Sequence, residues 1–401
     1  MTAPERVVPP EGDDFYLPPV PLPPGEYGDV IRSRPLTGVA ALRSASHNEL
    51  VLYRSEAVDG TPIAVSGIVA LPPAPAPDGG YPLIGWAHGT LGLGDKCAPS
   101  RDNEEIAAEL PEHHEINQSP HVLLNALLEA GWAVAMTDYE GMGTPGPHPF
   151  LLGRSEAHGV LDLVRAARRL YPVISDRFAL VGHSQGGQGA LFAAHHADRI
   201  PEFTLLGVAA LAPASHIVED LIAGSDYDGY TGGLAFTPLL LTGAIIGSRA
   251  EATEERPAID ALEVLSTEAY TLFTASADRC RVELSACEAW GGIKGNAQFR
   301  GSLTQDPNPH QREFLRQVER TNPALTIPVP IRVSHAQRDE RVKIAYSTRL
   351  VAELGELGNN IVYRIHARVA DGGSLGAHFG LIETDVPELL AWLRDRERAK
   401  H

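Results

Sequence analysis

A serine between two glycines is the first residue of this chain whose surroundings suggest chemistry. The stretch Gly182-His183-Ser184-Gln185-Gly186 follows a short apolar run and precedes small residues at helical spacing. This G-x-S-x-G pattern, placed between a strand and a helix, is the context of a nucleophile elbow. The turn is so tight that Gly182 and Gly186 must lack side chains. We therefore predict that Ser184 is a nucleophile; the alternative is an ordinary turn between a strand and a helix.

Acyl transfer to a serine also requires N–H donors for the oxyanion that develops on the substrate. One donor follows the nucleophile, which predicts the backbone N–H of Gln185. The second comes from the loop after an early strand, and His88-Gly89-Thr90 lies at the end of such a run. We predict the N–H of Gly89 or Thr90 there, with the Thr90 hydroxyl as a further donor. The alternative is a glycine-rich turn with a core histidine.

The serine needs a histidine base, and the base needs an acid that orients it. In a chain with this elbow the order is serine, acid, histidine. Asp339 comes just after a predicted strand, and His378 lies in a glycine-rich turn after the last predicted strand. We therefore predict a triad of Ser184, Asp339 and His378. Glu340 and Asp371 remain rival acids.

The elements around these residues alternate between strand and helix from residue 83 to residue 196, which indicates a parallel sheet with helices on both faces. Antiparallel lead-in strands are predicted before it, at residues 49–54 and 63–71. The later predicted strands are 83–86, 132–137, 178–181, 205–211, 331–334 and 361–368. The predicted helices are 119–130 with a Ser119 cap, 154–170 with a Ser155 cap, and 386–398.

The alternation stops between residues 212 and 322, a stretch too long for a loop in a compact domain. It contains an apolar segment, 234–246, and a helix-like segment, 258–274. We expect a helical cap whose apolar content forms either a pocket for an apolar group or simply its own small core. The predicted organisation is an irregular surface arm at 1–28, the first part of an α/β core at 29–211, the inserted cap at 212–322, and the second part of the core at 323–401.

The composition narrows the possible partners. The 401 residues carry a formal net charge of −18, which argues against nucleic acid and anionic membrane surfaces. No transmembrane run is present, and residues 1–19 lack the apolar region of a signal peptide. As the sequence stands we expect a cytoplasmic protein; the alternative is secretion after removal of a leader. The oligomeric state stays open.

Two patterns in the sequence suggest a metal or a cofactor, but neither has the features that such a site requires. Gly141, Gly143 and Gly146 match G-x-G-x-x-G, but three nearby prolines prevent the helix that a dinucleotide site needs. The cluster at 112–115, Glu-His-His-Glu, has no histidine pair at i, i+4, so we predict a solvated surface. The three cysteines show no metal-binding spacing either. We predict no metal and no cofactor.

Several motifs together resemble the secretory lipase family of α/β-hydrolases, and the resemblance extends over most of the chain. The serine motif and the His88-Gly89-Thr90 turn are among them. The others are Cys97-Ala98-Pro99-Ser100, Asp138-Tyr139-Glu140-Gly141 with Thr144-Pro145-Gly146, Gly153-Arg154-Ser155-Glu156, Phe15-Tyr16-Leu17-Pro18-Pro19 and Arg32-Ser33-Arg34-Pro35.

This resemblance implies an α/β-hydrolase core with a helical cap and a Ser-Asp-His triad that hydrolyses small-molecule carboxylic esters without a cofactor. It also implies that Cys97 pairs with a cysteine of the cap, although Cys280 and Cys287 would equally suit each other. Two other functions remain open. One is an acyltransferase that uses the same acyl-enzyme, and the other is a non-catalytic ligand-binding protein on the same fold.

Overall fold

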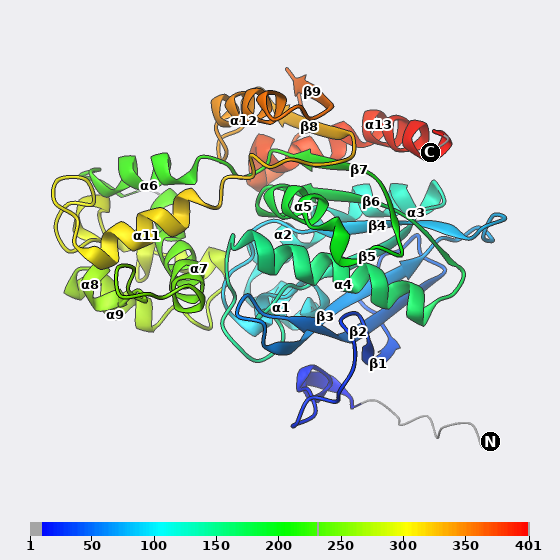
Figure 1. Ribbon diagram of the computed structural model, residues 1–401, viewed down its shortest axis with the longest axis horizontal. Coiled ribbons are helices and arrows are strands. Elements are labelled where there is room, and N and C mark those ends of the chain that lie inside the picture. Colours follow the sequence, from blue (N-terminus) through cyan, green and yellow to red (C-terminus); the bar gives the residue numbers. More distant parts are fainter. Residues whose placement is uncertain (1–9, 231, 400–401) are drawn as a thin grey trace.

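A mixed β-sheet forms the centre of the protein. The computed structural model describes residues 10–230 and 232–399, and within them nine strands form one sheet in the order β1-β2-β3-β5-β4-β6-β7-β8-β9 (Figure 1). The strands are β1 (Val30–Pro35), β2 (His47–Glu56), β3 (Pro62–Leu71), β4 (Tyr81–Ala87), β5 (Ala133–Thr137), β6 (Ile174–His183), β7 (Thr204–Leu211), β8 (Ile331–Ala336) and β9 (Ile361–His366).

The strand directions confirm the predicted sheet. β1, β2, β3 and β5 pair antiparallel, whereas β5, β4, β6, β7, β8 and β9 pair parallel in that spatial order. Neighbouring residues of the central strands face opposite sides and are buried on both: Leu180 belongs to one apolar cluster and Val181 to the other. Burial on both faces explains why these strands read as continuous apolar runs.

Helices cover both faces of the sheet (Figure 1). α4 (Gly153–Leu170), α5 (Gln185–His195) and α12 (Ile344–Glu356) pack on one face, and α3 (His121–Glu129) and α13 (Gly376–Arg398) pack on the other. Over the described ranges, 10–230 and 232–399, no helix is both long enough and apolar enough to cross a bilayer.

A group of helices lies between β7 and β8 in the chain and beyond one end of the sheet in space (Figure 1). They share an apolar cluster that includes Leu241, Trp290 and Phe314. This group falls within the segment 212–322 that we propose as the cap. Its helices are α6 (Ile217–Ser225), α7 (Thr237–Ala250), α8 (Ala261–Val264), α9 (Thr267–Thr274), α10 (Arg281–Leu284) and α11 (Pro309–Glu319).

Shorter elements complete the chain. The helices α1 (Glu104–Glu109) and α2 (Pro111–Gln118) lie between β4 and β5. The 3₁₀ turns are η1 (Gly12–Tyr16), η2 (Asp95–Cys97), η3 (Pro99–Arg101), η4 (Ala197–Arg199), η5 (Gly232–Phe236), η6 (Trp290–Gly292), η7 (Gly295–Ala297) and η8 (Gly373–Leu375).

A disulfide joins the core to the helical insertion. Cys97, in η2 after β4, is bonded to Cys280, just before α10, across 183 residues of sequence. An isolated β-bridge between Gly92 and Cys280 adds to this connection. Cys287 is a free, exposed thiol. Cys97 therefore pairs with a cysteine of the insertion, as the family resemblance implied, and Cys280 does not pair with Cys287.

The N-terminal segment differs in part from the surface arm predicted at 1–28. Residues 1–9 of that prediction lie outside the described residues. In η1, Phe15 and Tyr16 are buried, and the Tyr16 hydroxyl donates a hydrogen bond to the carbonyl of Ser100 at 3.0 Å. These two aromatic side chains hold the segment onto the core, because together they remove a large apolar area from water.

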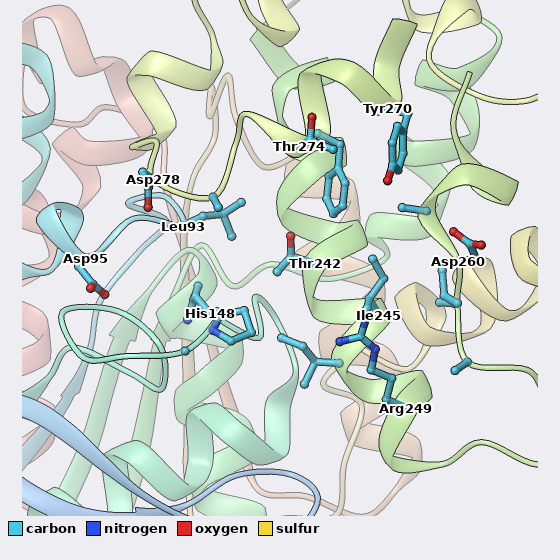
Figure 2. Close-up of a pocket in the computed structure, with 18 residues that line it drawn as sticks. Leu93, Asp95, His148, Thr242, Ile245, Arg249, Asp260, Tyr270, Thr274 and Asp278 are labelled. Atoms are coloured by element: carbon cyan, nitrogen blue, oxygen red, sulfur yellow. The ribbon is translucent and has the colours of Figure 1, made fainter. Parts of the chain in front are cut away.

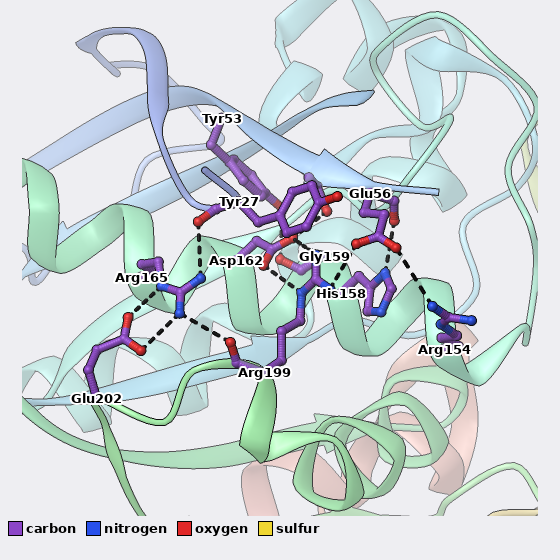
Figure 3. Close-up of polar contacts among 11 residues, drawn as sticks. Tyr27, Tyr53, Glu56, Arg154, His158, Gly159, Asp162, Arg165, Arg199 and Glu202 are labelled. Carbon is purple, nitrogen blue, oxygen red and sulfur yellow. Dashed lines mark hydrogen bonds and ion pairs between the residues drawn. The ribbon is translucent and has the colours of Figure 1, made fainter. Parts of the chain in front are cut away.

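A buried ion pair connects α4 to η4 beneath the antiparallel strands (Figure 3). The Arg199 guanidinium donates to both carboxylate oxygens of Asp162, at 2.8 and 3.0 Å. The Ser55 hydroxyl of β2 donates to the same carboxylate at 2.7 Å. Glu56 accepts a further bond from Arg199. A fully buried carboxylate is tolerated here because each oxygen has a donor.

Several local predictions were wrong. Ser119 is not the cap of α3, because its hydroxyl bonds back to Ile116 at the end of α2. Ser155 lies inside α4, where its hydroxyl donates to Glu140. The single helix expected at 258–274 is broken into α8 and α9, and Ser266 caps α9. In the first two cases the hydroxyl bonds to a partner other than the helix end that the local pattern indicated. In the third, the predicted helix is interrupted between α8 and α9.

Candidate active site

The turn between β6 and α5 holds Ser184 in a backbone conformation that residues other than glycine rarely adopt, with φ 60° and ψ −121°. Its neighbours explain how the turn closes. A Cβ atom added to Gly182 would lie 2.0 Å from the carbonyl oxygen of Gly186, and one added to Gly186 would lie 1.9 Å from that of Ala87. Both positions therefore exclude any side chain.

The backbone around Ser184 is held by the neighbouring strand. The Ser184 N–H donates to the Leu211 carbonyl at the end of β7, at 2.9 Å, and the Ser184 carbonyl accepts from Ala214 at 3.1 Å. Gly187 donates to the same carbonyl at 2.9 Å, which starts α5. The strained conformation persists because these bonds fix both sides of the peptide.

The loop after β4 lies directly against the serine. A Cβ atom added to Gly89 would lie 3.5 Å from the Cβ of Ser184, so the predicted oxyanion loop and the predicted nucleophile are in contact distance. Gly89 and Thr90 are half-buried. His88 is buried, and its carbonyl accepts a hydrogen bond from the Tyr139 hydroxyl at 3.1 Å. Burial lowers the pKa of His88 to about 4, so this imidazole is a neutral part of the loop's support.

His378 and Asp339 are joined by a short hydrogen bond. The Nδ1 atom of His378 lies 2.7 Å from Oδ2 of Asp339, and both side chains are buried. The other carboxylate oxygen accepts the backbone N–H groups of Arg341 and Val342, each at 2.8 Å. Burial alone would raise the pKa of Asp339, but the hydrogen bond and charge of His378 and these two N–H groups outweigh it and lower the pKa to about 2. The carboxylate is therefore ionised and oriented toward the imidazole.

His183 connects the elbow to His378. Its Nε2 atom donates to the backbone carbonyl of His378 at 3.0 Å, and the two imidazole rings lie 4.3 Å apart between centroids. Burial holds the pKa of His183 well below its usual value, so the ring is neutral. Because His183 directly precedes Ser184, this contact ties the predicted base to the elbow turn.

The position of His378 within its element differs from the prediction. The sequence placed it in a glycine-rich turn and began the last helix at residue 386. The structure begins α13 at Gly376, and His378 lies in its first turn. The helix continues through Pro387, although a proline inside a helix lacks the N–H for one backbone bond. The base therefore stands on a long helix packed on the sheet.

The two rival acids have other partners. Glu340 accepts the backbone N–H groups of Ala377 and His378, at 3.1 and 3.4 Å, at the start of α13. Asp371 accepts the N–H of Gly373 at 3.0 Å. Of these three candidate acids, all within the described part of the chain, Asp339 is the one whose carboxylate bonds to the His378 imidazole.

Glu156 and His148 lie near the elbow, and the sequence assigned neither of them a role. The side-chain amide of Gln185 donates to Oε1 of Glu156 at 2.8 Å, and the same nitrogen lies 3.2 Å from Nε2 of His148. Glu156 lies one and two turns before Val160 and Val164 on the apolar face of α4. A carboxyl on an otherwise apolar helix face is the signal that would have identified it.

A cavity of about 830 Å³ lies between the core loops and the helical insertion (Figure 2). Its wall combines apolar side chains with a few polar ones, as small-molecule sites usually do. His148 lines it from the core side. The residues that the insertion contributes include Thr242, Ile245, Ile246, Arg249, Ile259, Tyr270, Phe273 and Thr274.

The cluster at 112–115 is only in part the solvated surface that was predicted, since Glu112 and Glu115 are exposed. His113 is fully buried, with Nε2 3.1 Å from the Asn117 amide and 3.9 Å from Sγ of Cys280. His114 pairs with Asp102 and Glu112 with Arg281. The prediction failed at His113 because α2 is covered by the disulfide-bonded insertion, which is remote in sequence.

Another acidic group resembles a metal site only in its spacing. His366, Asp385 and Glu388 have ligand atoms within 4.8 Å of one another. Asp385, however, already accepts bonds from the two terminal nitrogens of the Arg332 guanidinium and from the Ser334 hydroxyl. Its charge is therefore balanced within the protein, and we assign no metal there.

Comparison with known proteins places this arrangement in a class. The esterase LipA of Xanthomonas oryzae, described as degrading the rice cell wall, superposes with a TM-score of 0.70 at 21% identity, covering 93% of this chain and 100% of LipA. The sheet order, the elbow after β6 and this likeness define an α/β-hydrolase fold.

Sequence comparison adds a match to a family over part of the chain. The model of the secretory lipase family matches residues 113–270. A Mycobacterium tuberculosis protein named "Probable inactive lipase" is 27% identical over 214 residues, 52% of this chain but only 46% of that relative, so the match spans just under half its length. Lipase A of Arthroderma benhamiae is 26% identical over 416 residues, covering 98% of this chain and 81% of the relative. The resemblance to the secretory lipase family is thereby confirmed.

Proposed function

We propose that this protein hydrolyses carboxylic esters of small molecules through an acyl-enzyme on Ser184. The observation that carries the proposal is the contact between His378 and Asp339 at 2.7 Å, with His378 in turn bonded to His183, the residue before the strained Ser184. A serine hydroxyl is a weak nucleophile unless a base removes its proton, and a buried carboxylate orients that base. The secretory lipase match supports the ester as the bond that is cleaved.

In the proposed reaction, Nε2 of His378 takes the Ser184 proton while Oγ attacks the ester carbonyl. The carbonyl oxygen gains the negative charge and is stabilised by the N–H of Gln185 and the N–H of Gly89 or Thr90, with the Thr90 hydroxyl as an additional donor. The imidazolium of His378, stabilised by Asp339, then protonates the leaving alcohol. Water, deprotonated by His378, attacks the acyl-enzyme and releases the acid.

We propose that the cavity beneath the helical insertion receives the apolar acyl or alcohol part of the ester. Neither Ser184 nor His378 lines it; it borders the elbow through His148, whose Nε2 contacts the Gln185 amide. Ile245 lines it on the side of the insertion (Figure 2). Ile259 and Phe273 line the same side. We propose residues 212–322 as the cap over the core segments 29–211 and 323–401, with 1–28 as the N-terminal segment. The family name also favours the secreted alternative for localisation over a cytoplasmic one.

Two other functions use the same geometry. An acyltransferase would transfer the acyl group from Ser184 to a second alcohol or amine instead of water. A non-catalytic ligand-binding protein is favoured by one observation, the relative that is named as an inactive lipase. The paired His378 and Asp339 count against that reading, because a protein without turnover has no need of an oriented base.

The experiment that tests the proposal is hydrolysis of p-nitrophenyl esters from C2 to C16, together with labelling by an alkyl phosphonate and mass spectrometry. We expect turnover, one phosphonate on Ser184, and a loss of several orders of magnitude in kcat for Ser184→Ala with the fold intact. A labelled serine with turnover only when an alcohol is added would favour the acyltransferase. Neither label nor turnover would favour the binding protein.

A further inference from the structure

The side chain that follows the nucleophile is buried and bonded on the far side of the elbow. Gln185 is 1% exposed, and its amide nitrogen reaches both Glu156 and His148. The proposed reaction uses only the backbone N–H of Gln185. Its side chain therefore has a separate role, which its two partners indicate.

His148 can only be the acceptor in this contact. Its Nδ1 atom lies 2.9 Å from the carbonyl of Glu140, so Nδ1 carries the proton. Burial lowers the pKa of His148 to about 4, so the ring is neutral and Nε2 has a free lone pair. One amide hydrogen of Gln185 thus points to Nε2 of His148, and the other points to Oε1 of Glu156.

Glu156 is built into the interface between α4 and α5. It is 1% exposed, and a Cβ atom added to Gly189 would lie 2.8 Å from its Oε2. The absence of a side chain at Gly189 gives the carboxyl room one turn beyond Gln185. Burial raises the pKa of Glu156 to about 8, against a smaller opposing effect of the Gln185 hydrogen bond. A buried position favours the protonated form of the carboxyl near neutral pH.

We propose that Glu156 is a positioning residue for the oxyanion donor: with His148, it locks the Gln185 side chain and so holds the Gln185 backbone N–H toward the ester carbonyl. This inference rests on the proposed function, because it assigns a role to the same oxyanion site. It adds two residues, Glu156 and His148, that the triad and the elbow motif do not contain.

The position of an oxyanion donor determines how strongly it stabilises the negative charge of the transition state. Loss of one such donor costs roughly 10²- to 10³-fold in kcat, and a displacement of a fraction of an ångström forfeits part of that. The Gln185 N–H shares a planar peptide with the Ser184 carbonyl, which Ala214 and Gly187 hold on its other side. The Cα of Gln185, at the first position of α5, is the part that its side-chain bonds can hold in addition. Two bonds from its own side chain remove the remaining freedom.

Ionisation of Glu156 should also affect the developing oxyanion at the active site. The groups next to it are Gln185 and Gly189 from α5, and Tyr139 and the Leu151 backbone from the preceding loop, with His148 sharing the Gln185 amide. Burial keeps His148 neutral and raises the pKa of Tyr139 well above its usual value, so neither offers a compensating charge. An ionised Glu156 therefore places a negative charge behind the developing oxyanion, and kcat should fall as the pH rises through about 8.

The test uses kcat and KM for p-nitrophenyl butyrate between pH 6 and 10, on the full chain. Glu156→Leu removes the acceptor, and we expect kcat to fall roughly tenfold to a hundredfold with KM within about twofold. Gln185→Leu keeps the backbone N–H and should show a similar loss. In the double variant the losses should not multiply, because both substitutions break one interaction.

Glu156→Gln is the conservative variant. Its amide oxygen still accepts from Gln185, so kcat near pH 7 should stay close to that of the unsubstituted protein, while the fall above about pH 8 disappears. Glu140→Gln is the matched control, since burial raises the pKa of Glu140 to about 7 but its carboxyl bonds to Ser155 rather than to Gln185. We expect it to retain the alkaline fall.

The outcomes separate this inference from the proposed function. If the unsubstituted protein turns over and labels at Ser184 but folded Glu156→Leu matches it in kcat, the positioning role is wrong and the hydrolase proposal stands. If Glu156→Leu does not fold, an alkaline fall that persists in Glu156→Gln overturns the inference instead. Absence of both turnover and label in the unsubstituted protein overturns both proposals.

Discussion

The Nδ1 atom of His378 lies 2.7 Å from Oδ2 of Asp339, although 39 residues separate them in the chain. Asp339 follows β8, and His378 stands in the first turn of α13 on the far side of β9. Two backbone N–H groups bond to the other carboxylate oxygen, while Oδ2 faces the His378 imidazole, with Nε2 of His335 at 3.5 Å. The acid is therefore held in one orientation before any substrate binds.

We first predict that Asp339→Asn lowers kcat for ester hydrolysis by roughly 10³- to 10⁴-fold. An amide in place of the carboxylate can present an N–H to Nδ1, which stabilises the wrong tautomer of His378 and gives no stabilisation to the imidazolium. Steady-state kinetics measures the loss, and circular dichroism shows that the fold is kept.

The matched control is Glu340→Gln at the next residue. Glu340 accepts backbone N–H groups at the start of α13 and pairs with Arg341, and it does not bond to the His378 imidazole, so we expect less than about a tenfold loss in kcat from it. A larger loss in Glu340→Gln than in Asp339→Asn would identify Glu340 as the acid instead.

A second prediction concerns stability in acid. The pKa of Asp339 is lowered from 3.8 to about 2 in the folded protein. The folded state thus binds this proton less readily than the unfolded chain, and the stabilisation is present above about pH 4 and lost as the pH falls toward 2. The shift corresponds to roughly 2 kcal/mol.

Urea unfolding at pH 5 and at pH 2.5 measures this loss. The difference in unfolding free energy between the unsubstituted protein and Asp339→Asn should narrow by about that amount at the lower pH. A constant difference would show that His378 does not stabilise the ionised carboxylate.

A third prediction concerns the bond between core and insertion. Because Cys97 and Cys280 are fully buried and 183 residues apart, replacing both by alanine should lower the unfolding free energy by about 2–5 kcal/mol. Cys287→Ser is the control, since this thiol is free and exposed, and it should change stability by less than about 0.5 kcal/mol. Chemical denaturation without reductant gives both values. Equal stability of the two variants would contradict the structural role of the disulfide.

A fourth prediction concerns the cavity under the insertion. Ile245 of α7 lines it, so Ile245→Trp should reduce its volume and shift the p-nitrophenyl ester profile toward shorter chains (Figure 2). We expect kcat/KM for C2 and C4 esters to stay within about threefold and that for C12 to C16 esters to fall by at least about tenfold, since each excluded CH₂ forfeits about 0.8 kcal/mol.

Ile365→Trp provides the comparison for this variant. Ile365 is 51% exposed on β9 and does not line the cavity, so the same substitution there should leave the profile unchanged. An unchanged profile in Ile245→Trp as well would show that the cavity does not receive the substrate.

Much of the core fold could be predicted because its signals are local. Parallel strands buried on both faces appear as short apolar runs, and the helix between two of them must return along the sheet. The strand β6 and the turn at Ser184 followed from this pattern. The helix boundaries were less predictable: Ser119 and Ser155 look like caps in sequence, but Ile116 and Glu140 take their hydroxyl groups.

Interactions between distant segments could not be predicted from the sequence. Glu112-His113-His114-Glu115 reads as a polar surface, yet His113 is buried against Cys280. No local pattern reports what will cover a helix face when the covering segment lies about 170 residues further along the chain. The break between α8 and α9 is of the same kind, because Leu265 between them pairs with Phe299 of a later segment.

The sequence by itself determined the features that depend on backbone geometry at one place: the turn around Ser184, where Gly182 and Gly186 leave no room for a Cβ atom, and the alternation that forms the sheet. Only the tertiary structure decided which acid contacts His378 and which cysteine bonds to Cys97. It also brought Glu156 to Gln185. The physical reason is that a hydrogen bond or a disulfide requires a few ångströms between two specific atoms, and that distance is set by how whole elements pack.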